Sequence, residues 1–358
     1  MIKEETFNAE RIKDFRKQKE FAKIDVIILE KMIYALYLLE LLKIEKLDFI
    51  FKGGTSLVLL FKQPKRFSID VDILTKHSRE DIEKVLESIC ESYRFTRFEL
   101  DKNRSYQKDG VPKAHYYLYF NSSIEKKESQ IMLDVLFDEY FYPKTVELPL
   151  RSDFLVVDES VTKIRIPTIN SIAGDKITVF APNTSGYLYN KGLGIQIIKQ
   201  LFDLGYLFDE LDDYSEFADS FDKKFERLEK YFRKKWTQDQ ILDDILDSSL
   251  LLSSDKRSIS GIKLTKYEEL FSGISQLSNF LIKRPFNPDI AIESAAKTAL
   301  LAAKLMTRNF DPIDQFDREK GISGYQIEDE KYSFLNRYRR TPSLALFYFN
   351  QMVKVLNG

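Results

Sequence analysis

The pattern of apolar and polar positions changes near Pro167. Before it, short runs of alternating apolar and polar residues are mixed with runs of helical period, and after it the helical period continues almost to the end. Alternating runs predict strands, and runs of period 3.6 predict helices. The sequence therefore predicts an α+β protein: residues 1–166 form a mixed sheet with flanking helices, and residues 167–358 form an all-helical domain.

The N-terminal part contains both kinds of run. Helices are predicted from Arg11 to Glu20, from Ile24 to Leu42, and over "SREDIEKVLESICESY", which begins with a serine cap. "LDFIF" predicts a strand that ends at Gly53 and Gly54, and we expect Thr55 to cap the helix that follows. Further strand-like runs are "RFSIDVDIL", "RFTRFELD", "AHYYLYFN" and "SQIMLDVLFD", then the shorter "VELPL", "FLVVDE" and "KIRIP". Single loops join the second, third and fourth of these runs, so we expect them to be antiparallel neighbours.

The C-terminal part predicts several helices beyond "TINSIAGDKITVFA". Their ranges are Gly194 to Phe208, Tyr214 to Lys235, Gln238 to Leu252, Ile290 to Met306 and Pro342 to Leu356.

Composition narrows the class of protein. The 358 residues include 55 basic and 56 acidic side chains, so nucleic-acid binding would have to come from local patches rather than from net charge. The one cysteine, Cys90, excludes an internal disulfide framework and suits the cytoplasm. We expect no membrane span and no signal peptide, because no long apolar run occurs and the first residues are charged. The two histidines, His77 and His115, have no neighbouring cysteine and are interpreted as ordinary strand-end or loop residues.

Two carboxylates one residue apart raise the central question about chemistry. In "SIDVDI", Asp70 and Asp72 point to the same face of a strand, with Cα atoms roughly 6.5 to 7 Å apart. Like charges so placed repel unless a cation lies between them, and carboxylate oxygens are ligands that Mg²⁺ prefers. Upstream, Gly53 and Gly54 close a strand and open a helix, whose N–H groups suit a phosphate, and Thr55 and Ser56 add hydroxyls. Together these parts predict a site for a metal-bound triphosphate.

A third carboxylate, Asp134 in "SQIMLDVLFD", is predicted to lie on a neighbouring strand and to complete a two-metal site. Alone, a glycine pair is usually a turn and an Asp-x-Asp is usually an exposed strand face. Their order along the chain favours the site over these readings.

The same residues resemble the signature of the nucleotidyltransferase superfamily, and "KGGTSL" with "RFSIDVDI" is similar to the AbiEii/AbiGii toxin family of type IV toxin–antitoxin systems. The match covers Leu47 to about Leu211. The residues that match the first motif are Lys52, Gly53, Gly54, Thr55, Leu57, Arg66, Ser68, Asp70 and Asp72. The resemblance implies a nucleotidyltransferase-like sheet, a helical domain that contributes lysine and aspartate to the active site, Mg²⁺ or Mn²⁺, and an NTP substrate.

The family's later residues match with one departure. Lys176 in "SIAGDK" and Lys199 and Asp203 in "IIKQLFDLGYL" correspond to its lysine and aspartate, but Gln200 stands where a first aspartate is common. Lys176 suits the triphosphate or charge that develops in the reaction, and the alternative is a solvent-facing lysine on a helix. Three readings of Asp203 stay open: a helix-surface residue, the ion-pair partner of Lys176, or a base toward the acceptor. Arg66 contacts phosphate or braces the aspartates, and Ser68 binds phosphate or orients a ligand carboxylate.

The resemblance implies transfer of a nucleoside monophosphate to the 3′ end of tRNA, neutralised by a separately encoded antitoxin, as in abortive infection. Two alternatives stay open: transfer to a protein or small-molecule hydroxyl, and a GTP- or NTP-binding regulatory module without turnover. Basic clusters for an RNA acceptor occur at "KQPKR" beside the site, at "DKKFERLEKYFRKKW" and at "RYRR", although each is more simply a solvated face.

Overall fold

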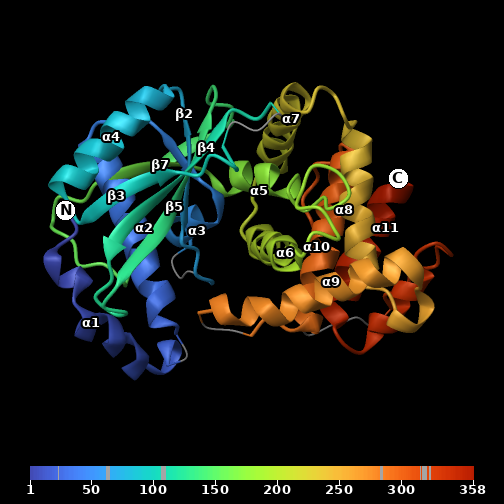
Figure 1. The fold of residues 1–358 in the computed structure, drawn as a ribbon. Coiled ribbons are helices and arrows are strands. Elements are labelled where there is room, and N and C mark those ends of the chain that lie inside the picture. The colour runs from blue at the N-terminus through green and yellow to red at the C-terminus, as the bar shows by residue number, and fades with distance from the viewer. Residues whose placement is uncertain are drawn as a thin grey trace. The chain divides into compact units, whose positions relative to one another are not determined.

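The computed structural model describes residues 1–22, 24–61, 65–105, 110–282, 285–314, 316, 321 and 324–358. The chain divides into two compact units, coloured in sequence order in Figure 1. Unit 1 comprises Met1–Thr168 and Asn279–Arg284, and unit 2 comprises Ile169–Ser278 and Pro285–Gly358. The predicted fold class is confirmed, because a five-stranded mixed sheet is followed by a helical C-terminal region.

One short segment differs from the predicted domain organisation. The sequence analysis places residues 279–284 in the helical domain, whereas they belong to unit 1. Leu281 forms an antiparallel bridge with Arg66, and the backbone N–H groups of Phe67 and Ile282 donate to the carbonyls of Phe280 and Lys65. Backbone pairing of this kind depends on no particular side chains, so the sequence carries no sign of it.

The sheet of unit 1 has the strand order β1-β2-β5-β4-β3. β2 is antiparallel to β1 and parallel to β5, whereas β3, β4 and β5 form an antiparallel series, which confirms the expected neighbours. β6 and β7 form a separate pair. The bounds are β1 Ile50–Lys52, β2 Asp70–Thr75, β3 Phe95–Leu100, β4 Lys113–Asn121, β5 Glu128–Phe137, β6 Thr145–Pro149 and β7 Lys163–Pro167.

One face of the sheet packs into the hydrophobic core of unit 1. Alternate residues of the strands, such as Val71, Leu118 and Leu133, pack with apolar residues of α2 and α4. α2 is apolar around most of its circumference and begins at the side-chain cap Asp25. α4 begins at the predicted serine cap, Ser78, which forms a capping box with Asp81. The helices of this unit are η1 Glu4–Phe7, α1 Ala9–Asp14, η2 Phe15–Lys17, η3 Lys19–Phe21, α2 Val26–Ile44, α3 Gly53–Leu60 and α4 Arg79–Ser92.

Two predicted elements of unit 1 are wrong. The helix expected from Arg11 to Glu20 ends as α1 at Asp14 and continues as the 3₁₀ turns η2 and η3. "FLVVDE" is no strand, although its Val157 forms an isolated bridge with Ile2.

A buried glutamate fixes the hairpin between β4 and β5. Glu30 of α2 is 1% exposed, and its carboxylate accepts hydrogen bonds from the hydroxyls of Ser122 and Ser123 and from the N–H of Ser123, at 2.5 to 2.7 Å. A buried carboxylate needs such donors, so the turn is held at one position on the helix. The register of β4 against β5 therefore depends on α2.

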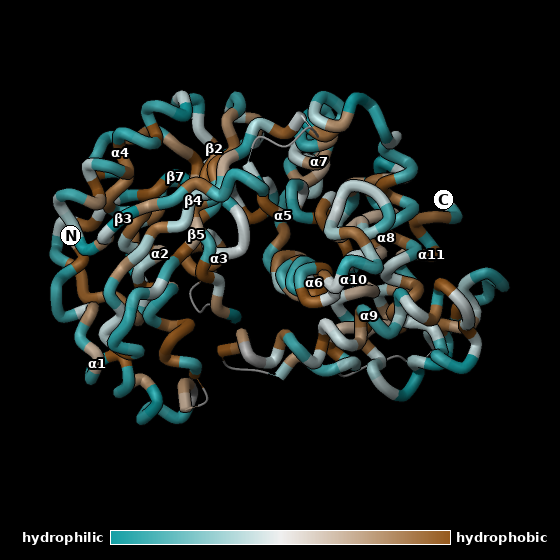
Figure 2. Tube along the Cα trace, in the orientation of Figure 1, coloured by the Kyte–Doolittle hydropathy of each residue, from teal (hydrophilic) through white to brown (hydrophobic). Residues whose placement is uncertain are grey.

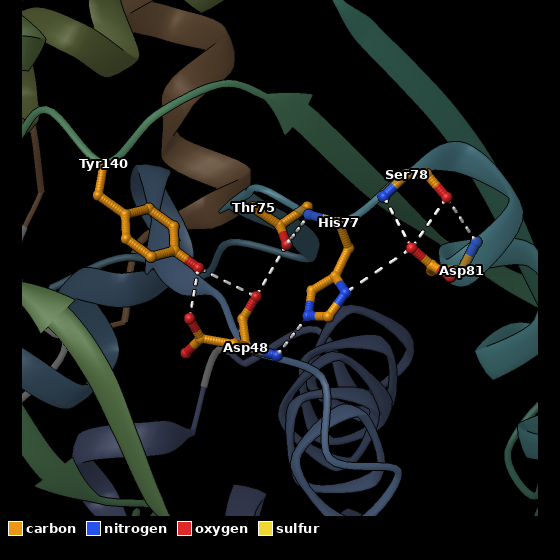
Figure 3. A network of polar contacts seen from close by, with 6 residues as sticks. All are labelled: Asp48, Thr75, His77, Ser78, Asp81 and Tyr140. Atoms are coloured by element: carbon orange, nitrogen blue, oxygen red, sulfur yellow. Dashed lines mark hydrogen bonds and ion pairs between the residues drawn. The ribbon is translucent and has the colours of Figure 1, made fainter.

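A second polar network lies where β2 ends (Figure 3). Asp48 accepts a hydrogen bond from Tyr140 at 2.7 Å and pairs with Arg165 at 2.8 Å. Its N–H donates to Nε2 of His77, and its carbonyl accepts from the hydroxyl of Thr75. We call this the Asp48 network. His77 follows β2 and belongs to it, which agrees with an ordinary structural histidine.

Unit 2 contains the remaining helices. Along α6, hydrophilic and hydrophobic positions interleave, as expected for a helix with one buried side (Figure 2). α6 and α8 have the predicted bounds, and α9 was not predicted. The helices are α5 Ile169–Ile177, α6 Gly194–Phe208, α7 Tyr214–Tyr231, α8 Gln238–Leu252, η4 Lys256–Ser258, α9 Gly261–Leu277, η5 Ser278–Phe280 (which runs into unit 1), α10 Pro288–Thr307, η6 Ser333–Arg339 and α11 Ser343–Asn357. No helix within the described ranges is long and apolar enough to cross a bilayer.

Candidate active site

The face of the sheet away from α2 and α4 carries the three predicted carboxylates. Asp70 and Asp72 alternate with the fully buried Val71 and Ile73 of β2, so both lie on the face opposite α2 and α4. Asp134 of β5 is the direct cross-strand neighbour of Asp72. Neighbouring strands are about 4.8 Å apart, so the structure places two like charges directly opposite each other.

The glycine corner packs against these carboxylates. Gly53 has φ +77°, and a Cβ added to it would lie 2.6 Å from Cγ of Asp72. A Cβ on Gly54 would lie 2.6 Å from Nη2 of Arg66 and 3.1 Å from Oγ of Ser68. At both positions the neighbouring side chain uses the space where a Cβ would be, and at Gly53 the backbone conformation also favours glycine. The glycine pair and the Asp-x-Asp strand therefore pack directly against each other.

The hydroxyls of Thr55 and Ser56 donate within the protein. Thr55 was expected to cap the helix, but α3 begins at Gly53 and Thr55 lies inside its first turn. Its hydroxyl donates to the carbonyl of Asp70 at 2.5 Å, and that of Ser56 donates to the carbonyl of Gly53 at 2.8 Å. Thr55 thus ties α3 to the start of β2.

Arg66 and Ser68 lie beside the glycine corner. Arg66 is buried and donates from Nη1 to the carbonyl of Phe67 at 3.1 Å, while its backbone is held by the bridge to Leu281. Its guanidinium is therefore fixed against Gly54.

His115 belongs to the candidate site, contrary to its interpretation from the sequence as a strand-end or loop residue. It lies inside β4, not at a strand end or in a loop, and it pairs with Asp134 across the strands. Its Nδ1 is 2.5 Å from Oδ1 of Asp134, and its side chain is 8% exposed. Arg104, in the loop after β3, also faces this carboxylate. Although burial opposes its charge, the charge of Asp134 and a hydrogen bond with Tyr117 raise the pKa of Arg104.

The side chains present determine which kind of metal site this face can form. Across the described residues, no three or more histidine, cysteine, aspartate or glutamate side chains are close enough together to hold an ion by themselves. Magnesium, however, is usually bound by one or two carboxylates together with water and substrate phosphates. The paired carboxylates beside a helix N-terminus therefore fit a cation that arrives with a triphosphate, and do not fit a site made of protein ligands alone.

In unit 2, α5 and α6 bring Lys176 and Asp203 together. Nζ of Lys176 is 2.8 Å from Oδ2 of Asp203, and their side chains are 7% and 2% exposed. Lys176 also donates to Oε1 of Gln200 at 2.9 Å. Gln200, the departure from the family pattern, thus acts as a neutral acceptor beside the ion pair. Asp175 is paired with Lys224 of α7 at 2.6 Å.

The basic clusters differ in what the structure shows of them. Lys62 of "KQPKR" lies outside the described residues, whereas Lys65 and Arg66 are described. In "RYRR", the Arg337 guanidinium lies 5.6 Å from the Tyr338 ring centroid and 3.7 Å from the carboxylate of Asp255. An acidic neighbour at this point agrees with a solvated face.

A protein-family model matches more than half of the chain. The model described as "Nucleotidyl transferase AbiEii toxin, Type IV TA system" matches residues 37–278. The match begins in α2 and ends just after α9, so it includes the candidate site residues from Lys52 to Asp203. It also extends the resemblance found in the sequence beyond Leu211 to residue 278.

Solved structures give more distant likenesses. A protein of H. pylori classed as a nucleotidyltransferase shares 17% identity, with a TM-score of 0.43, over 79% of this chain and 97% of its own. An antigenic nucleotidyltransferase-like protein from Paracoccidioides brasiliensis shares 13% identity, with a TM-score of 0.36, over 57% of this chain and 92% of its own. Neither likeness is close enough to bear on activity. No curated protein matches the chain.

Proposed function

Because this chain belongs to the AbiEii nucleotidyltransferase toxin family of type IV toxin–antitoxin systems, we propose that it transfers a nucleoside monophosphate from an NTP to the 3′ end of an RNA. The acceptor we propose is tRNA, in the cytoplasm, and the metal is Mg²⁺. A separately encoded antitoxin would oppose the activity.

The opposed pair Asp72 and Asp134 carries the proposal. Two carboxylates at one register of a sheet repel each other, and cross-strand like charges are destabilising. The Gly53 backbone is packed against the first of them, at the start of a helix whose N–H groups suit a phosphate. A triphosphate with its bound cation would fit both parts of this arrangement: the cation would offset the repulsion between the carboxylates, and the phosphates would accept hydrogen bonds from the N–H groups of the helix.

Each site residue then has a physical role. We assign Asp70, Asp72 and Asp134 to the metal, and the backbone N–H groups of the glycine corner, from Gly53 to Ser56, to the triphosphate. Arg66 and Ser68 are assigned to the same phosphates or to the orientation of the carboxylates. The bound Mg²⁺ supplies electrostatic stabilisation of the attacking and leaving oxygens.

The proposed reaction exchanges one phosphoester linkage for another. The acceptor hydroxyl oxygen forms a bond to the α-phosphorus of the NTP, and the bond from that phosphorus to the oxygen bridging the β-phosphate breaks. The hydroxyl proton passes to a base, and pyrophosphate leaves with the bridging electron pair. A protein carboxylate is the proposed base.

Lys176 and Asp203 enter the proposal through the family resemblance, as a cation for the triphosphate and its partner. Their burial complicates a direct test. Removing one partner of a buried ion pair leaves an uncompensated charge, which typically costs about 3–5 kcal/mol. A Lys176 variant would therefore lose stability together with activity, and Asp72 gives the cleaner test.

The experiment incubates the protein with pooled tRNA and each α-labelled NTP in turn, with Mg²⁺ and with EDTA. We expect label in RNA for at least one NTP, in the Mg²⁺ samples alone. The variant Asp72→Ala should abolish both transfer and growth inhibition.

Other results select other functions. Label in protein would replace the RNA acceptor with a protein hydroxyl. NTP binding without any transfer would indicate a regulatory module. Full toxicity of Asp72→Ala would contradict the enzymatic account.

A further inference from the structure

A row of polar residues crosses four strands at one register. Lys52 of β1 pairs with Asp72 of β2, Asp72 with Asp134 of β5, and Asp134 with His115 of β4. Directly paired residues project to the same face of a sheet, so the four side chains form one line across the face opposite α2 and α4. The two carboxylates occupy the middle, and a lysine and a histidine occupy the ends.

His115 holds the carboxylate at its end of the row. Nδ1 of His115 donates to Oδ1 of Asp134 at 2.5 Å, and the ring is almost completely buried. The backbone of His115 is itself fixed, because its N–H donates to Oγ of Ser105 at 2.9 Å and its carbonyl accepts from the N–H of Asp101 at 2.8 Å. The imidazole therefore presents its donor from a rigid position.

The hydrogen bond acts on the carboxylate from the side away from Asp72. Without a donor on β4, Asp134 would be free to rotate, and repulsion by Asp72 would favour its turning away from the shared position. A carboxylate that is hydrogen-bonded on one oxygen keeps a fixed orientation and presents the other oxygen to a ligand. Removal of a hydrogen bond to a metal-binding side chain typically lowers metal affinity or activity by about 10–100-fold.

We propose that His115 is a positioning residue that orients Asp134 for the metal-bound nucleotide. The proposal rests on the proposed function, because Asp134 is itself a proposed ligand. Arg104 differs from His115, because it is exposed and contributes charge to Asp134, whereas His115 contributes a directional bond from a buried ring.

The test compares two variants of His115 whose side-chain amides place a donor at the positions of different imidazole nitrogens. His115→Asn puts its amide nitrogen near the position of Nδ1, and His115→Gln reaches toward Nε2. His115→Ala removes the donor altogether. The control is His77→Asn, because His77 also has an aspartate neighbour, Asp81 at 3.8 Å, but belongs to the Asp48 network.

The measurement is Mn²⁺ binding by the full chain, followed by the EPR signal of the free ion. An equimolar mixture of the four α,β-methylene NTPs is present, because these analogues bind but cannot transfer the nucleoside monophosphate. We expect the Mn²⁺ Kd to rise about tenfold or more in the Gln and Ala variants, and to stay within about threefold in the Asn variant and the control. The Asn and Gln variants differ by one methylene, so their comparison holds even if the Ala variant fails to fold.

Equal Mn²⁺ affinity in the Asn and Gln variants would overturn the positioning role. Asp72→Ala separates this failure from that of the proposed function. If Asp72→Ala loses Mn²⁺ while every His115 variant keeps it, only the role of His115 is wrong. If Asp72→Ala binds Mn²⁺ as tightly as the unmodified protein, the metal site itself is wrong.

Discussion

The two ends of β2 carry polar networks of opposite character. At the Thr75 end, the Asp48 network sets the carboxylate against donors, namely Tyr140 at 2.7 Å and Arg165 at 2.8 Å (Figure 3). At the other end, the same strand sets Asp72 opposite Asp134. The Asp48 network sets its carboxylate among donors, whereas the other end sets two carboxylates next to each other between Lys52 and His115.

The difference separates stability from function. Groups that serve the fold alone are arranged so that each charge meets a donor or an opposite charge. Two like charges placed on directly paired residues lower the stability of the fold, and the remaining contacts of the sheet hold them in place. The Asp72 end therefore holds a repulsion between carboxylates that a bound cation would relieve, whereas the Asp48 network holds none.

The largest expected effect comes from Asp72→Asn. Asparagine keeps a hydrogen-bonding oxygen but removes one of the two opposed charges. We expect transfer to fall by about a thousandfold or more, because several kcal/mol of electrostatic stabilisation are lost. Without metal, stability should stay the same or rise by up to about 1 kcal/mol. Labelled transfer and urea unfolding in EDTA measure the two quantities.

The matched variant at the other end is Asp48→Asn, which should lose stability and keep transfer. If Asp72→Asn lost as much stability as Asp48→Asn, both ends of β2 would serve the fold. The contrast between the two ends would then be wrong.

The next effect concerns the glycine corner. In Gly53→Ala, the added Cβ meets the Asp72 carboxylate and the residue keeps φ near +77°. We expect a loss of about 1–2 kcal/mol from backbone strain and, because a displacement of about 1 Å near the chemistry can cost a hundredfold, a fall in transfer of about that size.

Gly192→Ala supplies the control for backbone strain. Gly192 has φ +68°, but a Cβ there meets nothing within 4 Å. It should lose a similar amount of stability and keep its transfer rate. An equal loss of transfer in both variants would mean that strain alone, and not the Asp72 contact, causes the effect.

Local patterns predict much of unit 1. The alternation in "SIDVDI" is enough to place Asp70 and Asp72 on the face opposite Val71, and the burial of β2 confirms that alternation. The order of strand, glycine pair and Asp-x-Asp strand likewise predicts that these motifs belong together. Side-chain period and chain order are local, so a single sequence contains them.

Register and long-range pairing are harder to predict. The hairpin closes at Asn121 and Glu128, and counting six residues back and six forward leads to His115 and Asp134. That register is anchored by Glu30, which is 92 residues from Ser122, and no local pattern announces it. The site histidine was missed for this reason.

Backbone contacts are the other limit of the sequence analysis. The bridge between Leu281 and Arg66 is made by main-chain atoms, so neither side chain predicts it. Thr55 shows the same limit, because its hydroxyl has two plausible uses at a helix start and the tertiary position of the Asp70 carbonyl decides between them.

The smallest expected effect is a pH dependence at the Asp48 end. Burial opposes ionisation of Asp48, but the hydrogen bond from Tyr140 and the charge of Arg165 outweigh it and hold the pKa of Asp48 below its usual 3.8. A carboxyl whose pKa is lowered by folding contributes stability above its unfolded pKa, and this contribution disappears as the pH falls through the folded value. Because the Asp48 side chain is 57% exposed, we expect it to contribute less than about 1 kcal/mol.

Urea midpoints of the unmodified protein and of Asp48→Asn, measured from pH 7 downward, test this sign. The amide cannot ionise, so the midpoints should differ by a constant amount down to about pH 5 and converge below 3.8. A difference for Asp48→Asn that grows toward low pH would mean that the Asp48 carboxylate is strained rather than satisfied, and the contrast between the two ends of β2 would then be lost.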